Sequence, residues 1–122
     1  MIKNTIFLVF AAILILAGCT QPAPQECSFA GKWNTTYGEM VLEQKGESVT
    51  GRYEHDQGRI NGIAKGSTLT GTWSELPSYQ PSDDAGDIVV NLDDCNSWSG
   101  KWRYGSTGAF TGTSGWTAKR IQ

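Results

Sequence analysis

Large apolar side chains alternate with small or polar ones along most of the chain after residue 26. A period of two is typical of half-buried β-strands, whereas an amphipathic helix repeats about every 3.6 residues. No stretch in this part follows the helical period. Six alternating runs each share one face: Met40, Leu42 and Gln44; Val49, Gly51 and Tyr53; Ile60, Gly62 and Ala64; Leu69, Gly71 and Trp73; Ile88, Val90 and Leu92; Trp98, Gly100 and Trp102.

Turn-forming residues separate these runs, at residues 45–47, 57–58, 65–67, 93–96 and 105–108. Together with a strand near each end of this region, they indicate eight strands spaced by roughly 8–12 residues, as in a barrel or sandwich. We therefore predict an all-β fold, an eight-stranded antiparallel up-and-down barrel. A small β-sandwich is the alternative.

A short motif recurs inside the predicted strands: apolar, small, glycine, any residue, aromatic. It occupies residues 29–33, 49–53, 69–73 and 98–102, and residues 110–112 begin in the same way. The glycine lies between two large inward side chains, where a Cβ would crowd, and it lets a strand coil tightly enough to close a small barrel. A ligand that approaches the bare backbone is the functional alternative.

One long gap interrupts the pattern, at residues 75–86. Long connections in compact domains are often lids or binding loops. Tyr79 lies in this gap, between Pro77 and Pro81. The segment is either a binding loop or a solvated surface loop.

The first 26 residues have a different character. Lys3 precedes an apolar run at residues 6–17, which is shorter than the ~20 residues that cross a bilayer. This combination is typical of an export signal. The run ends in Leu16-Ala17-Gly18-Cys19, which resembles the bacterial lipobox. The resemblance implies cleavage before Cys19 and acylation of its thiol; an ordinary secretory signal is the alternative.

We therefore expect a lipoprotein signal peptide at residues 1–18, a lipidated Cys19 with a short extended tether at 19–26, and a β-barrel domain at 27–122. Two or three acyl chains would anchor the chain stably, because one chain binds a membrane only marginally. By resemblance to Gram-negative lipoproteins, Thr20 implies transport to the outer membrane. The chain is thus expected to be exported and held at the cell envelope.

Charge and cysteine content narrow the possible partners. Removal of Lys3 with the signal takes the formal net charge from −2 to about −3, which argues against nucleic acid and against polybasic membrane binding. Glycine makes up 15 of the 122 residues, well above the average glycine content of about 7%. Frequent glycine suits short strands and tight turns. Cys27 and Cys95 are most simply one disulfide in an exported domain.

Enzyme signatures are nearly absent from the sequence. His55 is the single histidine, and neither a His-rich metal spacing nor a Gly-x-Ser-x-Gly motif occurs. Carboxylates cluster at residues 83–87 and 93–94, where weak calcium binding is an alternative to solvated turns. We expect no catalytic residues, no cofactor and no bound metal.

The first predicted strand and the last one resemble those of calycins, the group that holds lipocalins, fatty-acid-binding proteins and avidins. Gly31 and Trp33 form the Gly-x-Trp of the first strand, and Arg120 is the arginine of the last. The resemblance implies that Arg120 lies over Trp33 and closes one barrel end. An early-to-late cysteine bridge also occurs in avidins. The chain is similar, too, to short Gly/Trp-rich envelope proteins.

The positions that contact biotin in avidins are only partly matched. Thr35 and Glu39 stand at first-strand polar positions, Tyr53 matches a ligand tyrosine, and His55 stands where a hydroxyl residue is expected. A carboxylate at Glu39 would meet the polar head of biotin unfavourably. We expect that the domain does not bind biotin.

The inward aromatic residues either fill the barrel or line a pocket, because an eight-stranded interior is just wide enough for side chains or one small ligand. Our first hypothesis is a binding module for a small apolar or amphipathic ligand. Its proposed contacts are Tyr53, Trp73, Trp98, Trp102 and Tyr79. The alternatives are a solid barrel that binds or inhibits an envelope protein, and a carbohydrate-binding module.

Overall fold

The computed structural model describes residues 27–121. The predicted signal peptide, Cys19 and the tether lie outside the described residues. The described part contains eight strands and one short 3-10 helix: β1 (Gly31–Thr35), β2 (Gly38–Lys45), β3 (Ser48–Tyr53), η1 (His55–Gln57), β4 (Gly58–Lys65), β5 (Thr68–Ser74), β6 (Ala85–Asp94), β7 (Ser97–Trp102) and β8 (Trp116–Arg120). None of these elements is a helix long and apolar enough to cross a bilayer.

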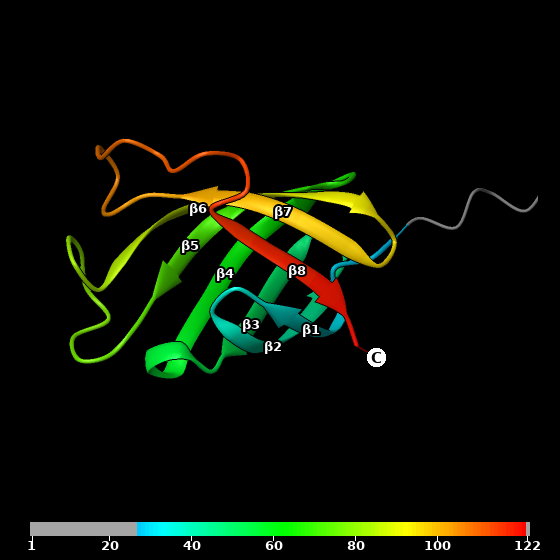
Figure 1. The fold of residues 1–122 in the computed structure, drawn as a ribbon, viewed down its shortest axis with the longest axis horizontal. Helices are drawn as coiled ribbons and strands as arrows, with labels where there is room; N and C mark the ends of the chain where they lie inside the picture. The colour runs from blue at the N-terminus through cyan, green and yellow to red at the C-terminus, as the bar shows by residue number, and fades with distance from the viewer. Residues whose placement is uncertain (1–26, 122) are drawn as a thin grey trace, which may run out of the picture.

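The strands form one closed antiparallel barrel in which each strand pairs with the next and β8 pairs with β1 (Figure 1). The prediction of an eight-stranded up-and-down barrel is confirmed, and the sandwich alternative is not. Closure removes the unpaired edges that an open sheet would expose.

The alternation observed in the sequence places one face of each strand inside the barrel. Most large residues on that face contribute to a single core whose side chains are at most 4% exposed, and the partly buried Leu92 and Trp102 pack against it. The core consists of Phe29, Trp33, Met40, Leu42, Val49, Tyr53, Ile60, Ala64, Leu69, Trp73, Ile88, Val90, Trp98, Trp116 and Ala118. Outward positions are mostly polar, so the period of two alone accounts for the direction of these side chains.

The repeated glycines allow neighbouring strands to approach closely. Gly62 of β4 lies opposite Gly71 of β5, and a Cβ on Gly71 would lie 2.6 Å from the Cα of Gly62 and would also strike the carbonyl oxygen of Asn61. The obstacle at Gly71 is therefore the backbone of the adjacent strand, whereas the sequence suggested crowding by large inward side chains.

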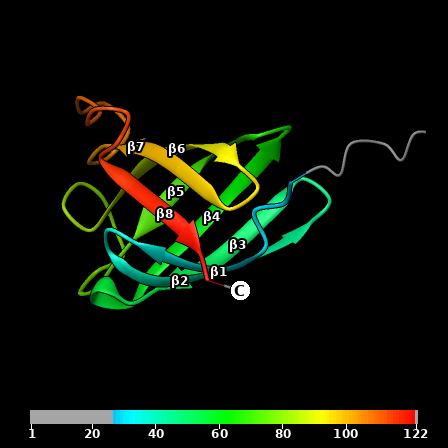
Figure 2. The same cartoon turned by 45° about the vertical axis from the view of Figure 1, so that its right-hand side comes forward.

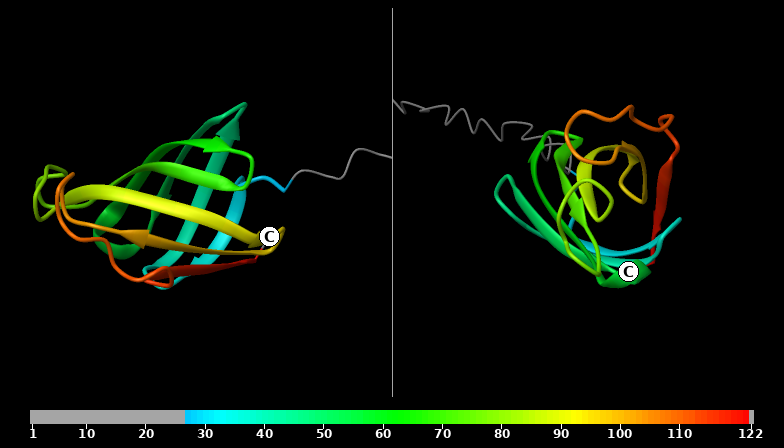
Figure 3. Two further views of the ribbon diagram at one scale, coloured as in Figure 1. Left: turned by 90° about the horizontal axis from the view of Figure 1, so that it is seen from above. Right: turned by 90° about the vertical axis from the view of Figure 1, so that its left-hand side faces the viewer.

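Up-and-down topology sorts the connections between the two ends of the barrel. The tight turns at residues 46–47, 66–67 and 95–96 lie at one end, together with residues 27–30 and the C-terminus (Figure 2). Residues 36–37, η1, 75–84 and 103–115 lie at the other end, which we call the mouth (Figure 3).

Two long loops lie at the mouth, whereas the sequence indicated only one long gap. The first runs from 75 to 84, because Ala85 and Gly86 already belong to β6. The second, at residues 103–115, includes the segment 110–112, which the repeated motif suggested as a strand. Thr111 explains this difference, because its backbone N–H donates to the carbonyl of Trp102 and its side chain accepts from the N–H of Trp102. The segment therefore folds back against the end of β7.

Arg120 closes the end opposite the mouth. Its guanidinium carbon lies 4.2 Å from the centre of the Trp33 ring. The guanidinium donates hydrogen bonds to the carbonyls of Ala30 at 2.6 Å, Ser28 at 2.8 Å and Cys95 at 3.0 Å. These bonds join the first described residues, the β6–β7 turn and the last strand, so this end of the barrel is tied at three points.

A disulfide between Cys27 and Cys95 joins two of the same segments, with a Cα–Cα distance of 4.9 Å. Phe29 is fully buried beneath this connection. Its carbonyl accepts a hydrogen bond from the indole N–H of Trp33 at 2.9 Å. Residues 27–30 thus form a plug over the closed end.

We expect Arg120→Ala to lower the free energy of unfolding by about 2–4 kcal/mol, because three hydrogen bonds from a charged group and a cation–π contact are lost. Urea denaturation measures this change. The control is Lys119→Ala, at an exposed neighbouring position, for which the change should stay within about 0.5 kcal/mol. Equal losses in both variants would contradict the role given to Arg120.

Candidate functional site

A cavity of about 180 Å³ opens at the mouth of the barrel. Every connection at this end contributes to it, as do the adjoining ends of β5, β7 and β8. Its lining residues are Tyr37, His55, Trp73, Glu75, Asp83, Trp102, Tyr104 and Trp116. Five of these eight side chains are aromatic and two are carboxylates, which gives the cavity apolar walls with a small number of charged groups.

Three of the rings meet nearly at right angles. The centroids of Trp73 and Trp102 are 5.6 Å apart with an interplanar angle of 82°, and those of Trp102 and Tyr104 are 5.1 Å apart at 90°. Trp73 and Tyr104 complete the set at 5.8 Å and 69°. Edge-to-face packing of this kind is favourable because the positive edge of one ring meets the negative face of another. We call Trp73, Trp102 and Tyr104 the aromatic corner.

Below the cavity, aromatic side chains fill the barrel. Trp116 packs edge-on against Tyr37 at 4.8 Å and against Tyr53 at 4.9 Å. Trp98 lies between Trp116 and Trp33, at 6.3 and 6.1 Å. The cavity is therefore a shallow cup on a packed interior.

Hydrogen bonds hold two of the indoles in place. The N–H of Trp116 donates to the Thr35 hydroxyl at 3.1 Å, and that of Trp73 donates to the carbonyl of Arg103 at 3.1 Å. The buried N–H groups of Trp98 and Trp102 have no hydrogen-bond partner within residues 27–121.

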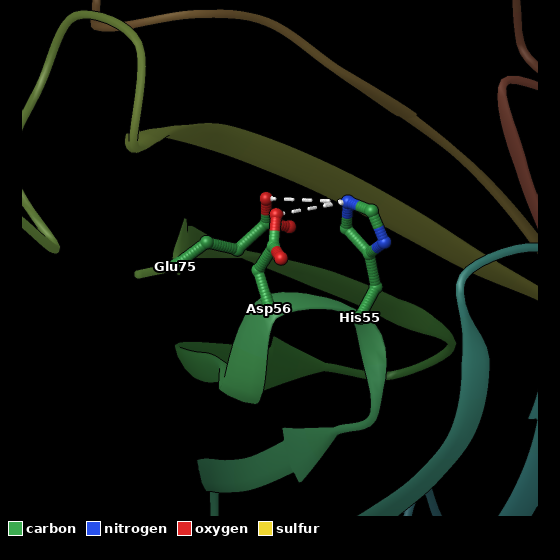
Figure 4. Close-up of side chains that lie close together, drawn as sticks. All are labelled: His55, Asp56 and Glu75. Atoms are coloured by element: carbon green, nitrogen blue, oxygen red, sulfur yellow. Dashed lines mark ion pairs between the residues drawn. The ribbon is translucent and has the colours of Figure 1, made fainter. Parts of the chain in front are cut away.

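One side of the rim is formed by His55, Asp56 and Glu75 (Figure 4). The Nε2 of His55 lies 3.3 Å from Oδ2 of Asp56 and 3.9 Å from Oε1 of Glu75. Asp56 and Gln57 both have a φ of 47°, a left-handed conformation that is uncommon outside glycine. This tight connection between β3 and β4 brings the imidazole and the Asp56 carboxylate to the same side of the rim.

Glu75 is held from below by Tyr53, whose hydroxyl donates to Oε2 at 2.6 Å. The Tyr53 ring packs over Gly58, where any Cβ would collide with the ring. Burial raises the pKa of the Tyr53 hydroxyl, and the hydrogen bond to Glu75 raises that pKa further. Tyr53 therefore acts as a neutral donor that orients Glu75 toward the mouth.

The same three rim residues offer donor atoms that suit a divalent cation. The ligating atoms of His55, Asp56 and Glu75 all lie within 4.8 Å of one another, and one imidazole nitrogen with two carboxylates is a donor set that zinc accepts. In the structure these groups face one another, and His55 and Asp56 are more than half exposed.

The structure separates the residues that the sequence suggested as ligand contacts. Trp73 and Trp102 line the cavity. Tyr53 lies beneath its rim, and Trp98 is only 1% exposed in the packed interior. Tyr79 lies outside the cavity, stacked on the guanidinium of Arg59 at 4.0 Å.

The other cavity residues were not identified from the sequence as ligand contacts. Tyr37 lies in a two-residue turn, and Glu75, Asp83 and Tyr104 lie in loops without a strand pattern. A topological signal was available, because in an up-and-down barrel the connections after the first, third, fifth and seventh strands all meet at one end. Combining the predicted strand order with these loop residues would have grouped them.

Two polar positions suggested by the avidin resemblance also lie outside the cavity lining. Glu39 alternates with the buried Met40 and lies 3.4 Å from the ammonium of Lys32. The Thr35 hydroxyl donates to the carbonyl of Gly38 at 2.7 Å.

Most carboxylates of the two clusters noted in the sequence form hydrogen bonds or ion pairs with nearby residues. Asp84 accepts a hydrogen bond from the Ser78 hydroxyl at 2.7 Å, and Asp87 pairs with Arg103 at 2.6 Å. Asp94 accepts from the N–H of Asn96 and from the Ser97 hydroxyl, which lowers its pKa. These contacts stabilise loops and turns.

Searches of the chain against family models, curated proteins and solved structures found no match.

We expect Tyr53→Phe to lower the free energy of unfolding by about 1–2 kcal/mol near neutral pH, because Glu75 loses its buried donor. The pKa of Tyr53 is raised in the folded protein. The contribution of the Tyr53 hydroxyl to the free energy of unfolding is therefore complete below the ordinary pKa of 10.0 and declines as the pH rises above that value. The stability difference between wild type and variant should thus narrow at alkaline pH.

Urea denaturation at a series of pH values measures this difference. Tyr104→Phe is the control, because no hydrogen bond of the Tyr104 hydroxyl occurs within the described residues. If the free energies of unfolding of wild type and Tyr53→Phe differ by the same amount across the alkaline range, the role of the Tyr53 hydroxyl as a neutral donor to Glu75 is contradicted.

Proposed function

We propose that the chain is an exported lipoprotein that is anchored at the cell envelope, in the outer membrane where the cell has one. The support is the apolar segment at residues 6–17, the Leu16-Ala17-Gly18-Cys19 sequence and Thr20, all outside the described residues. The disulfide agrees with this location, because such bonds persist mainly in oxidising compartments.

We further propose that the barrel is a non-catalytic binding module whose mouth holds a small amphipathic ligand. The observation that carries this proposal is the cavity of about 180 Å³ with five aromatic rings and two carboxylates. Small-molecule sites characteristically combine apolar walls with a few convergent polar groups. Pockets for drug-sized ligands run to about 300–1,000 Å³, so only a compact group would enter.

The position of the mouth suits a tethered binding module. The described chain begins at the closed end, where Cys27 is bridged to Cys95. Lipid on Cys19 would therefore tether the closed end, and the mouth would open away from the anchoring membrane. A soluble ligand could then reach the cavity without crossing the bilayer surface.

A second candidate function, protein binding on the outer wall, is favoured by a separate observation. A hollow of about 520 Å³ lies over the outward faces of β2, β3 and β4. Arg52 and Arg59 are directly opposite each other there, and neither has an ion-pair partner within residues 27–121. Val41 is 42% exposed beside them.

Carbohydrate binding, the third candidate, requires an outward row of aromatic rings on which sugars can stack. The eight strands within residues 27–121 have no such row.

Lipidation predicts that Cys19→Ser abolishes both acylation and membrane retention. Cells grown with a labelled fatty acid should incorporate the label into the wild-type chain in the membrane fraction and not into the variant. Thr20→Ser is the control, because it changes a neighbour and keeps the acceptor thiol. Label on Cys19→Ser, or unlabelled wild type, would refute the proposed anchor.

Ligand binding predicts that the protein purifies with a small molecule at the mouth. The Cys19→Ser chain, exported behind an ordinary secretory signal and purified gently, is analysed by native mass spectrometry. We expect a bound small molecule, and Tyr104→Ala should weaken its affinity about ten-fold because one wall of the aromatic corner is lost. Tyr79→Ala, outside the cavity, should bind like wild type. An unliganded wild-type protein would contradict this function and shift the search to the outer wall.

A further inference from the structure

We propose that the mouth cavity selects an organic cation, an amine or quaternary ammonium group, over neutral and anionic molecules of the same shape. This inference rests on the proposed function, that the mouth binds a small ligand, and it names the chemical class of that ligand. It follows from three features of the cavity: the arrangement of its rings, the charge of its rim and the positions of the nearby cationic side chains.

The aromatic corner provides the first feature. Trp73, Trp102 and Tyr104 meet at 69–90° with centroids 5.1–5.8 Å apart, and all three line the cavity, so the ring surfaces that no neighbouring ring covers border the same space. The face of an aromatic ring carries negative potential, and a cation within about 6 Å of the centroid is attracted to it. Sets of rings at right angles are the known protein solution for quaternary ammonium groups. A flat sugar ring, in contrast, stacks on a single exposed face.

The charge of the rim provides the second feature. Glu75 and Asp83 line the cavity, and no lysine or arginine does. The Glu75 side chain is only 16% exposed, so its charge acts in a partly desolvated place where electrostatic attraction is less screened. Asp83 makes no ion pair and no side-chain hydrogen bond within the described residues. An anion would be repelled here, and a purely apolar ligand would cover a carboxylate without compensating it.

The nearby cationic side chains provide the third feature, because the two arginines closest to the mouth have their partners outside the cavity. Arg103 directly follows Trp102, yet its guanidinium pairs with Asp87 at 2.6 Å and lies 4.4 Å from the Phe110 ring. Arg59 stacks on Tyr79. His55 is the one basic side chain in the lining, and its imidazole faces Asp56 and Glu75. The cavity thus keeps a negative charge that a ligand can neutralise.

The size of the cavity limits what enters it. A volume of about 180 Å³ accommodates a compact head such as trimethylammonium, while a longer tail would extend into solvent. Because lipid on Cys19 would hold the closed end at the membrane, a cation free in solution is favoured over a headgroup of the anchoring bilayer.

The experiment compares choline with its neutral isostere 3,3-dimethyl-1-butanol, which has the same branched shape without the charge. Both are titrated into the Cys19→Ser chain, with binding followed by calorimetry and tryptophan fluorescence. We expect choline to bind about ten-fold more tightly, which corresponds to a cation–π contribution of about 1.4 kcal/mol. This comparison uses a single protein and so does not depend on how any variant folds.

Glu75→Gln then tests the charge of the rim, since glutamine keeps the shape and still accepts the Tyr53 hydrogen bond. We expect the choline affinity to fall about ten-fold and the affinity for the neutral isostere to stay unchanged. Glu54→Gln is the matched control, because it removes one charge from an exposed residue at the same end that does not line the cavity. It should leave the preference for choline intact.

The outcomes separate this inference from the proposed function. Equal affinities for the two isosteres would overturn cation selection and leave the small-ligand site standing. If neither isostere binds while native mass spectrometry finds a bound molecule, the cation inference alone is overturned. If neither binds and the purified protein is also empty, both fail. A preference for choline that survives Glu75→Gln would overturn the assigned role of the carboxylate.

Discussion

The pairing of β8 with β1 is the constraint on which the rest of the barrel depends. It places Arg120 opposite Trp33, and the guanidinium then covers the indole and ties residues 27–30 and the Cys95 carbonyl to the last strand. The strand pairing removes the free strand edges, and the contacts of Arg120 close one end. The disulfide reinforces the same junction, and the barrel interior opens at the end that carries the long loops.

How the interior is filled determines the depth of the site at that open end. Trp33, Trp98 and Trp116 occupy the barrel from the closed end upward, while Gly62 and Gly71 let the β4 and β5 backbones pass closely. A small barrel cannot hold large rings throughout and also enclose a deep cavity. The available space is therefore a cup at the mouth, where the walls come from loops as much as from strands.

Charges are sorted between the outside and the mouth of the barrel. Arg120 is used at the closed end, Arg103 pairs with Asp87 on the outer wall, and the cavity keeps Glu75 and Asp83. Burial of the Tyr53 hydroxyl beneath Glu75 keeps that donor neutral and the carboxylate oriented. The result is an apolar cup with an acidic rim, and this combination is the basis for the proposed small-ligand site and for its proposed preference for a cation.

The sequence by itself determined the eight strands, their inward faces and the cysteine pair, because a period of two and the turn residues are local features that burial then enforces. It also indicated Trp73 and Trp102 as candidate contacts. Only the tertiary structure decided which aromatic residues fill the interior and which line a cavity, since Trp98 and Trp102 have the same pattern and differ in height along the barrel. The loop residues Tyr37, Glu75 and Tyr104 follow no period. Their meeting depends on strand order and barrel closure, which bring together residues that are far apart in the chain.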